Sequence, residues 1–145
     1  MSPRTSTDVP ADPFAVRETP ARYALALDQH DPAALTDVLT EDATWTFTLT
    51  GKPGTGPITG RAAILDFVRR ATDGQSDRRR HHLTNVVVHS ADAGTAVVQA
   101  YLMLTSNAGG VASLVMTGRY TFGLRHVDDA WRIAELLLDL DNAES

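Results

Sequence analysis

Hydrophobic residues alternate with polar ones along most of the second half of the chain. Four such segments, residues 80–90, 95–106, 111–125 and 131–140, are separated by short stretches rich in Asp, Asn and Gly. Alternation with a period of two is typical of a strand with one buried face. Short connections require that consecutive strands run antiparallel. The pattern therefore predicts a four-stranded antiparallel meander, preceded by one more alternating strand at residues 44–50.

The first helix is predicted over residues 14–28, which are mostly good or neutral helix formers. Thr19 followed by Pro20 is a typical helix start, with a capping hydroxyl before a proline at the first helical position. The regular part of this helix is therefore expected at residues 20–29.

Two further helices and one loop complete the predicted elements. The pair Asp31-Pro32 repeats the start signal and predicts a short helix over residues 32–39. Residues 61–70 carry an apolar stripe at helical spacing, which predicts the third helix. Residues 51–60 contain four Gly and two Pro, so we expect a loop that could cover a pocket.

The order of these elements predicts an α+β fold. Three N-terminal helices pack on one face of a curved, mainly antiparallel sheet, which leaves a cone-shaped, barrel-like interior with a pocket. We expect residues 14–145 to form a single domain and residues 1–13, which lack an apolar core, to form a flexible N-terminal tail.

Composition narrows the class of protein. The chain has 145 residues, of which 43% are hydrophobic, and a formal net charge of -5, which argues against non-specific nucleic-acid binding. It contains no cysteine, which excludes disulfides, thiol nucleophiles and thiolate metal sites. No apolar run approaches the roughly 20 residues of a membrane span, so a cytoplasmic protein is expected.

Several short motifs occur in the order of these elements. They are Tyr23 through Asp31-Pro32 and Leu35, Leu39-Thr40-Glu41-Asp42-Ala43 leading to Trp45, Gly60-Arg61-Ala62-Ala63-Ile64, His81-His82-Leu83-Thr84-Asn85, Gly118-Arg119-Tyr120 and Trp131-Arg132-Ile133. In these motifs the chain resembles the nuclear transport factor 2-like superfamily, and within it SnoaL-like polyketide cyclases and their relatives, including scytalone dehydratase. The resemblance covers about residues 15–140 and implies a cone-shaped α+β barrel.

The resemblance to scytalone dehydratase implies two site residues. A catalytic histidine of that enzyme opens the strand after the third helix, and His82 matches it. Asp28, at the end of the first helix, matches a pocket carboxylate. The tyrosine before that carboxylate is Leu27 here, and the pocket tyrosine on the first strand is Phe47, so the chain departs from that enzyme at two positions.

His82 is the first catalytic candidate, because a pocket imidazole can move a proton near pH 7. Neighbouring side chains on a strand face opposite sides, so His81 is expected to be exposed or at a subunit interface. The alternative for His82 is a hydrogen-bonded histidine with a packing role.

Glu135 and Tyr101 are further catalytic candidates. Glu135 lies in an apolar row of the last strand, where desolvation would raise the pKa of its carboxyl group. Tyr101 could align or polarise a substrate oxygen. The alternative for Glu135 is an ion pair with an arginine at an interface. The alternative for Tyr101 is an aromatic contact in a core or a dimer interface. The expected substrate-binding residues are Trp45, Phe47, Met116, Arg119, Tyr120 and Phe122. The alternative is a structural ion pair for Arg119 and core packing for the other five.

No metal or cofactor is expected, since the sequence has no metal-binding histidine spacing, phosphate loop or dinucleotide fingerprint. The predicted function is a cofactor-independent cyclase, dehydratase or isomerase, of the lyase or isomerase class, that acts on a small hydrophobic natural-product intermediate. A non-catalytic ligand-binding or dimerisation module, or a small accessory subunit of a ring-hydroxylating oxygenase, is the alternative. The family resemblance also implies a homodimer formed through the outer face of the sheet.

Overall fold

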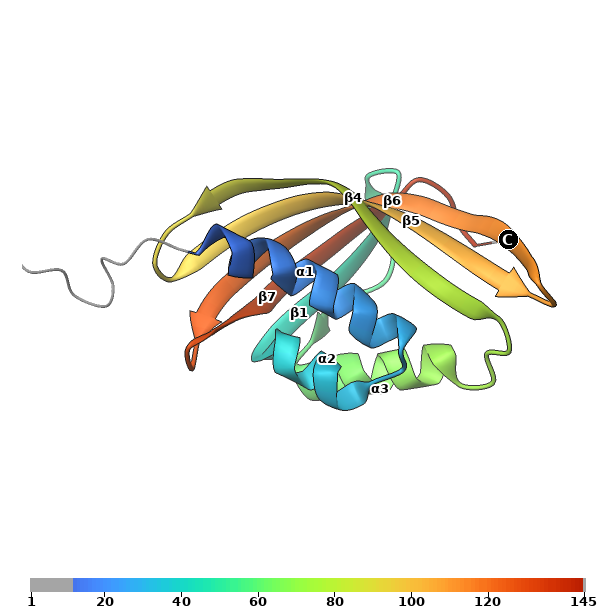
Figure 1. The fold of residues 1–145 in the computed structure, drawn as a ribbon, viewed down its shortest axis with the longest axis horizontal. Helices are drawn as coiled ribbons and strands as arrows, with labels where there is room; N and C mark the ends of the chain where they lie inside the picture. Colours follow the sequence, from blue (N-terminus) through green and yellow to red (C-terminus); the bar gives the residue numbers. More distant parts are fainter. Residues whose placement is uncertain (1–11, 145) are drawn as a thin grey trace, which may run out of the picture.

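The computed structural model describes residues 12–144 and contains three helices and one seven-stranded sheet (Figure 1). The predicted flexible tail falls almost entirely on residues 1–11, outside the described part. The elements are α1 (Pro13–Asp28), α2 (Pro32–Val38), β1 (Leu39–Leu49), β2 (Lys52–Pro53), β3 (Ile58–Thr59), α3 (Arg61–Thr72), β4 (Arg78–Ala91), β5 (Thr95–Ala108), β6 (Val111–Val127) and β7 (Ala130–Leu140).

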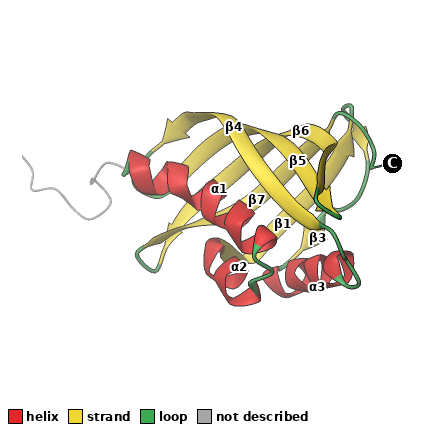
Figure 2. Ribbon diagram, turned by 45° about the vertical axis from the view of Figure 1, so that its right-hand side comes forward, coloured by secondary structure: helices red, strands yellow, loops and turns green. Residues whose placement is uncertain are grey.

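The four long strands β4 to β7 form the predicted antiparallel meander. Strand β1 joins the far edge by pairing in parallel with β7, which gives the order β2-β1-β7-β6-β5-β4. The sheet is strongly curved and does not close on itself, and the three helices cover its concave side (Figure 2). This arrangement confirms the α+β fold and the mainly antiparallel sheet, with helices instead of further strands closing the interior.

Helix α1 begins at Pro13, whereas the regular part of this helix was expected to begin at Pro20. The Asp12 carboxylate accepts a hydrogen bond from the Phe14 amide at 3.0 Å, and Pro13 occupies the first turn. Thr19 is therefore not the cap; its hydroxyl donates to the Ala15 carbonyl within the helix. Pro20 lies inside the helix. The second predicted cap is confirmed, since the Asp31 carboxylate accepts from the Ala34 amide.

The Gly- and Pro-rich segment does not lie over the pocket as a free loop. Its two short strands, β2 and β3, both pair antiparallel with β1. Gly56 has a φ of +99°, and a Cβ there would lie 2.7 Å from the Trp45 carbonyl oxygen, so only glycine allows this close approach. The segment therefore covers part of the edge of β1.

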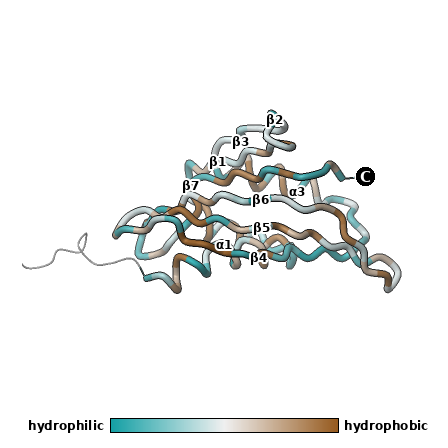
Figure 3. Tube along the Cα trace, turned by 90° about the horizontal axis from the view of Figure 1, so that it is seen from above, coloured by the Kyte–Doolittle hydropathy of each residue, from teal (hydrophilic) through white to brown (hydrophobic). Residues whose placement is uncertain are grey.

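The core fills the space between the helices and the concave face. Its largest fully buried side chains include Tyr23 from α1 and Tyr120 and Phe122 from β6. The long strands carry hydrophobic stretches as well as hydrophilic residues (Figure 3). Burial alternates on β5, where Ala96, Val98, Ala100, Leu102 and Leu104 are buried, as expected when one face is buried and the other is not. Within residues 12–144, no helix combines the length and the apolar character needed to cross a membrane.

Among the β-bulges of the sheet, one on β4 and one on β7 decide which of the predicted site residues face the core. One extra residue on β4 lies between Thr84 and Val87, where Asn85 has a φ of 54°. A second extra residue, Ala134, lies on β7, since Leu124 pairs with Ile133 and Gly123 with Glu135. Each bulge reverses the in-and-out alternation beyond it.

Candidate functional site

A pocket of about 310 Å³ lies between α1, α3 and the concave face of the sheet. Most of its wall is apolar and aromatic, with Trp45 and Phe47 from β1 facing Phe67 from α3. The polar or charged side chains in its wall are Tyr23, Asp28, His30, Thr72, Gln75, Arg79, His81, Tyr120 and Glu144. A second hollow, of about 440 Å³, adjoins it between α2 and α3 but is lined by neither His81 nor Asp28.

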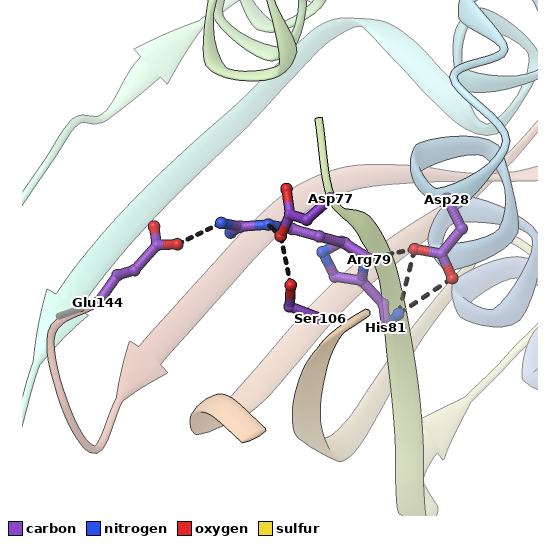
Figure 4. A network of polar contacts seen from close by, with 6 residues as sticks. All are labelled: Asp28, Asp77, Arg79, His81, Ser106 and Glu144. Carbon is purple, nitrogen blue, oxygen red and sulfur yellow. Dashed lines mark hydrogen bonds and ion pairs between the residues drawn. The ribbon is translucent and has the colours of Figure 1, made fainter. Parts of the chain in front are cut away.

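His81 and Asp28 form a dyad in the pocket wall (Figure 4). The Nδ1 atom of His81 lies 2.7 Å from Asp28 Oδ1, and the side chains are 18% and 9% exposed. The carboxylate also accepts the backbone N–H of His81, at 3.0 and 3.1 Å to its two oxygens. A carboxylate at Nδ1 selects the tautomer with the proton on that nitrogen, which leaves Nε2 as an acceptor.

The local sequence explains how this dyad forms. Asp28 is the last residue of α1, and β4 is the outermost strand at its edge of the sheet. The His81 amide therefore has no strand partner on that side, and the helix end supplies the acceptor that a half-buried N–H requires. The same bonds fix the carboxylate against the imidazole.

Two buried polar atoms of the pocket residues have no hydrogen-bond partner within the described chain: the Tyr23 hydroxyl and Trp45 Nε1. Burial raises the pKa of Tyr23 well above its usual value, and neighbouring Tyr120 raises it further, although the two hydroxyls are not in hydrogen-bonding geometry. Burial likewise raises the pKa of Tyr120. Both phenols stay protonated at neutral pH, so Tyr23 is a free donor.

Arg79 lies at the other end of the pocket wall, two residues before His81. Its Nε donates to the Asp77 carboxylate at 3.0 Å, and its Nη2 donates to Glu144 near the C-terminus (Figure 4). Asp77 also accepts the Ser106 hydroxyl. The pKa of Asp77 is held below its usual value mainly by the hydrogen bond from the Ser106 hydroxyl and, to a smaller extent, by Arg79.

The structure corrects the orientation predicted for the two histidines. His82 is exposed on the outer face, where its Nε2 lies 3.0 Å from the Thr105 hydroxyl, and His81 takes the pocket position. Asp28 does lie in the pocket, as the family resemblance implied. The strand that the resemblance indicated does supply a pocket histidine, and that residue is His81 and not His82.

Glu135 and Tyr101 also lie outside the pocket. Because Ala134 is an extra residue, Glu135 faces outward beside Gly123, while Ile133 and Leu136 both face the core. Tyr101 is 53% exposed on the outer face. The structure thus does not bring either side chain near the dyad.

Four of the six predicted substrate-binding residues line the pocket: Trp45, Phe47, Met116 and Tyr120. Phe122 is fully buried beneath the stacked ring of Tyr120 and is not part of the pocket wall. Arg119 is on the outer face, in a shallow depression with Tyr101.

Sequence reasoning missed Tyr23, Phe67 and Arg79 as pocket residues. Phe67 lies in the apolar stripe that the sequence predicts for residues 61–70, and this side of α3 lines the pocket through Phe67 and Val68. Arg79 and His81 are two residues apart on β4 and therefore face the same side, so a correct orientation for His81 would also have placed Arg79 in the pocket. Within residues 12–144, no cluster of three or more His, Asp or Glu side chains is arranged to hold a metal ion.

The sequence profile of the SnoaL-like domain matches residues 11–136 of this chain. The chain belongs to the SnoaL-like domain family. Solved structures of similar fold cover most of its length, as described next, whereas a search of curated proteins finds no significant match.

Three solved structures illustrate the similarity of this SnoaL-like chain. A protein from Novosphingobium aromaticivorans, provisionally named an aromatic ring hydroxylase, is 32% identical, with 91% of this chain and 90% of that chain covered and a TM-score of 0.74. The β subunit of a provisionally named aromatic-ring-hydroxylating dioxygenase from the same species is 15% identical, with 90% of each chain covered and a TM-score of 0.73. A protein from Catenulispora acidiphila in complex with S-DNPA is 18% identical, with 88% and 91% covered and a TM-score of 0.74.

Proposed function

We propose that this SnoaL-like chain is a cofactor-independent acid–base enzyme that removes a proton next to a carbonyl group of a small hydrophobic substrate. The observation that carries this proposal is the His81–Asp28 dyad in an apolar pocket that also holds an unpaired buried Tyr23 hydroxyl. A base, an orienting carboxylate and a donor for a developing oxyanion are the parts that enolisation needs.

In the proposed reaction, His81 Nε2 accepts the proton from the carbon beside the carbonyl. The electron pair of the broken C–H bond moves onto the carbonyl oxygen, where the Tyr23 hydroxyl donates a hydrogen bond to the enolate. Asp28 stabilises the imidazolium that forms. Return of the proton to another carbon gives isomerisation, and its delivery to a leaving hydroxyl gives dehydration with release of water. Attack of the enolate carbon on a second carbonyl closes a ring and leaves an alkoxide, which takes the proton back from the His81 imidazolium.

The pocket wall indicates the kind of substrate. The aromatic rings of Trp45, Phe47 and Phe67 contact one another at centroid distances of 4.9 to 5.9 Å and interplanar angles of 39° to 79°, and they form an apolar part of the pocket wall. The volume of about 310 Å³ suits a compact bicyclic or tricyclic molecule. Members of the SnoaL-like family are often cyclases or isomerases. The family membership and the apolar wall together support a hydrophobic natural-product intermediate as the substrate.

Exchange of the α-protons of 1-tetralone in D₂O, followed by proton NMR, tests this proposal without knowledge of the natural substrate. The wild-type protein should accelerate exchange above the rate in buffer, and His81→Ala should remove the acceleration. Retention of full exchange activity in His81→Ala would contradict the assignment of the base.

An accessory subunit of a ring-hydroxylating oxygenase is the second candidate, favoured by the neighbour that is 32% identical and named for ring hydroxylation. In that case the pocket would be a structural remnant of the fold or a binding site. The same experiment separates the two functions, because an accessory subunit should give no exchange with 1-tetralone. It should instead form a stable complex with a larger oxygenase subunit when the two are co-expressed.

A further inference from the structure

Arg79 extends the proposed site toward a particular class of substrate. We propose that Arg79 binds a carboxylate group of the substrate and that Glu144 occupies this position until the substrate displaces it. This inference rests on the proposed function, because it assigns a substrate class to the same pocket. The natural ligand would then be a small aromatic or polycyclic carboxylic acid.

The position of Arg79 on β4 supports this role. Arg79 and His81 lie two residues apart before the bulge, so both side chains face the pocket. Two residues of strand span roughly 7 Å. A bicyclic acid whose carboxylate lies at Arg79 would therefore present a ring carbon near His81. Among the pocket-lining side chains of residues 12–144, Arg79 is the one permanent cation.

The guanidinium is already oriented for a carboxylate. Asp77, itself held by the Ser106 hydroxyl, accepts from Nε and fixes the plane of the group. The Nη2 atom is left to donate, and the acceptor it meets is the carboxylate of Glu144. Arginine recognises carboxylates with directional charge-assisted hydrogen bonds, so a ligand carboxylate would make the same interaction.

Glu144 is suited to being displaced. It lies four residues beyond the end of β7, its side chain is 45% exposed, and the hydrogen bond to Arg79 is the side-chain contact described for it. The segment before it is held independently, by the Asp141 amide bonded to the Thr117 carbonyl and by Asn142 bonded to Val115. Exchange of a half-exposed ion pair for a ligand carboxylate costs little, because such pairs contribute little net stability.

Calorimetric binding of 1-naphthaleneacetate and of 1-naphthaleneacetamide at pH 8 tests the proposal, because the two probes differ in charge and hardly in shape. The wild-type protein should bind the acid about tenfold more tightly than the amide. Arg79→Gln should remove this preference, and Arg79→Lys should retain part of it. Glu144→Gln should tighten binding of the acid several-fold and leave binding of the amide unchanged.

Arg80→Gln is the matched control, since Arg80 is the next residue of β4, is exposed and faces the opposite side of the strand. It should leave the preference for the acid unchanged; an equal loss in Arg80→Gln and Arg79→Gln would indicate general electrostatic attraction and overturn the proposal. Weaker acid binding in Glu144→Gln, equal binding of both probes to the wild type, or binding of neither would also overturn it.

The two proposals fail separately. Calorimetry reports the carboxylate anchor whether or not any probe is turned over, whereas 1-tetralone has no carboxylate and reports the dyad. A preference for the acid without 1-tetralone exchange supports the anchor and contradicts the proposed chemistry. Exchange without a preference for the acid supports the chemistry and contradicts the anchor.

Discussion

The inner and outer sides of the sheet each present a histidine and a tyrosine, in different surroundings. His81 of β4 and Tyr23 of α1 lie in the wall of the inner pocket, whereas His82 of β4 and Tyr101 of β5 are exposed on the outer face. His81 is paired with Asp28 and lies beside a pocket, whereas adjacent His82 contacts a threonine hydroxyl at the surface. Tyr23 is fully buried with an unpaired hydroxyl, whereas Tyr101 is half-exposed.

This difference shows that residue type alone does not identify a catalytic group in this fold. Enclosure in an apolar wall strengthens each electrostatic interaction and leaves an unpaired donor available for a ligand. The outer residues have the same functional groups, but water competes for every hydrogen bond they make. Paired substitutions on the two faces therefore test the proposed site, each inner residue against its outer counterpart.

Replacement of the two histidines should give the largest contrast. His81→Ala should lower the protein-catalysed 1-tetralone exchange rate by about 10²- to 10⁴-fold, the usual contribution of a positioned general base. His82→Ala should change that rate by less than about twofold, because its ring lies outside the pocket. Proton NMR measures the exchange rates of the two variants, and circular dichroism checks that both variants are folded. Equal losses in both variants would contradict the assignment.

The same pair of histidines shows how far sequence reasoning reaches. Order, type and antiparallel pairing of the long strands follow from alternation and short turns, and these predictions are confirmed. Which side chains of a strand face inward depends, in contrast, on the positions of its bulges. Val86 and Leu83 both face inward. Steps of two residues back from Val86 would place His82 in the pocket, whereas steps of two back from Leu83 place His81 there. The bulge at Asn85 joins the two series, and nothing in the local sequence fixes its position.

A comparable bulge explains the misplacement of Glu135. The row predicted from Ile133 through Glu135 to Leu137 breaks at Ala134, so Glu135 and Leu137 face outward. The dyad partner Asp28 comes from a helix 53 residues away in sequence, and only the resemblance to a known family brought it into the predicted site. Long-range pairing of this kind depends on how α1 packs beside β4, which periodicity does not specify.

The tyrosine comparison should give the second-largest effect and separates function from stability. Tyr23→Phe should lower the exchange rate by about 10²-fold, because one oxyanion donor is lost. It should also raise the free energy of unfolding by about 1 kcal/mol, since a buried hydroxyl without a partner is removed. Tyr101→Phe should change neither quantity. Exchange kinetics and urea unfolding measure both, and a Tyr23→Phe variant with full activity would remove Tyr23 from the mechanism.

The outer face should matter for assembly instead of catalysis. Tyr101, Met103 and Leu137 are exposed there, and the depression beside them contains Arg119 together with Asp139. If this face forms the expected homodimer, Tyr101→Arg should weaken association by about 2 kcal/mol or more, about 30-fold in Kd. Phe14→Arg is the control, since Phe14 on α1 is an aromatic residue that is 83% exposed, against 53% for Tyr101. Sedimentation velocity measures both, and a monomeric wild type would contradict the expectation.

The smallest effect is expected for Asp139, which lies on the outer side of β7 and links β1 to the turn after it. Its carboxylate accepts the Thr48 hydroxyl at 2.6 Å and the Gly51 amide at 2.9 Å. The pKa of Asp139 is held below its usual value mainly by the hydrogen bond from Thr48. The hydrogen bond from Gly51 and the positive charge of Arg119 lower it further. A lowered folded-state pKa stabilises the protein above the unfolded pKa of about 3.9, and this contribution is lost as the pH falls through the folded pKa. Asp139→Asn should therefore unfold at lower urea concentration than wild type at pH 7, and the difference should shrink below pH 4. A difference independent of pH would show that shape and not charge is what Asp139 contributes.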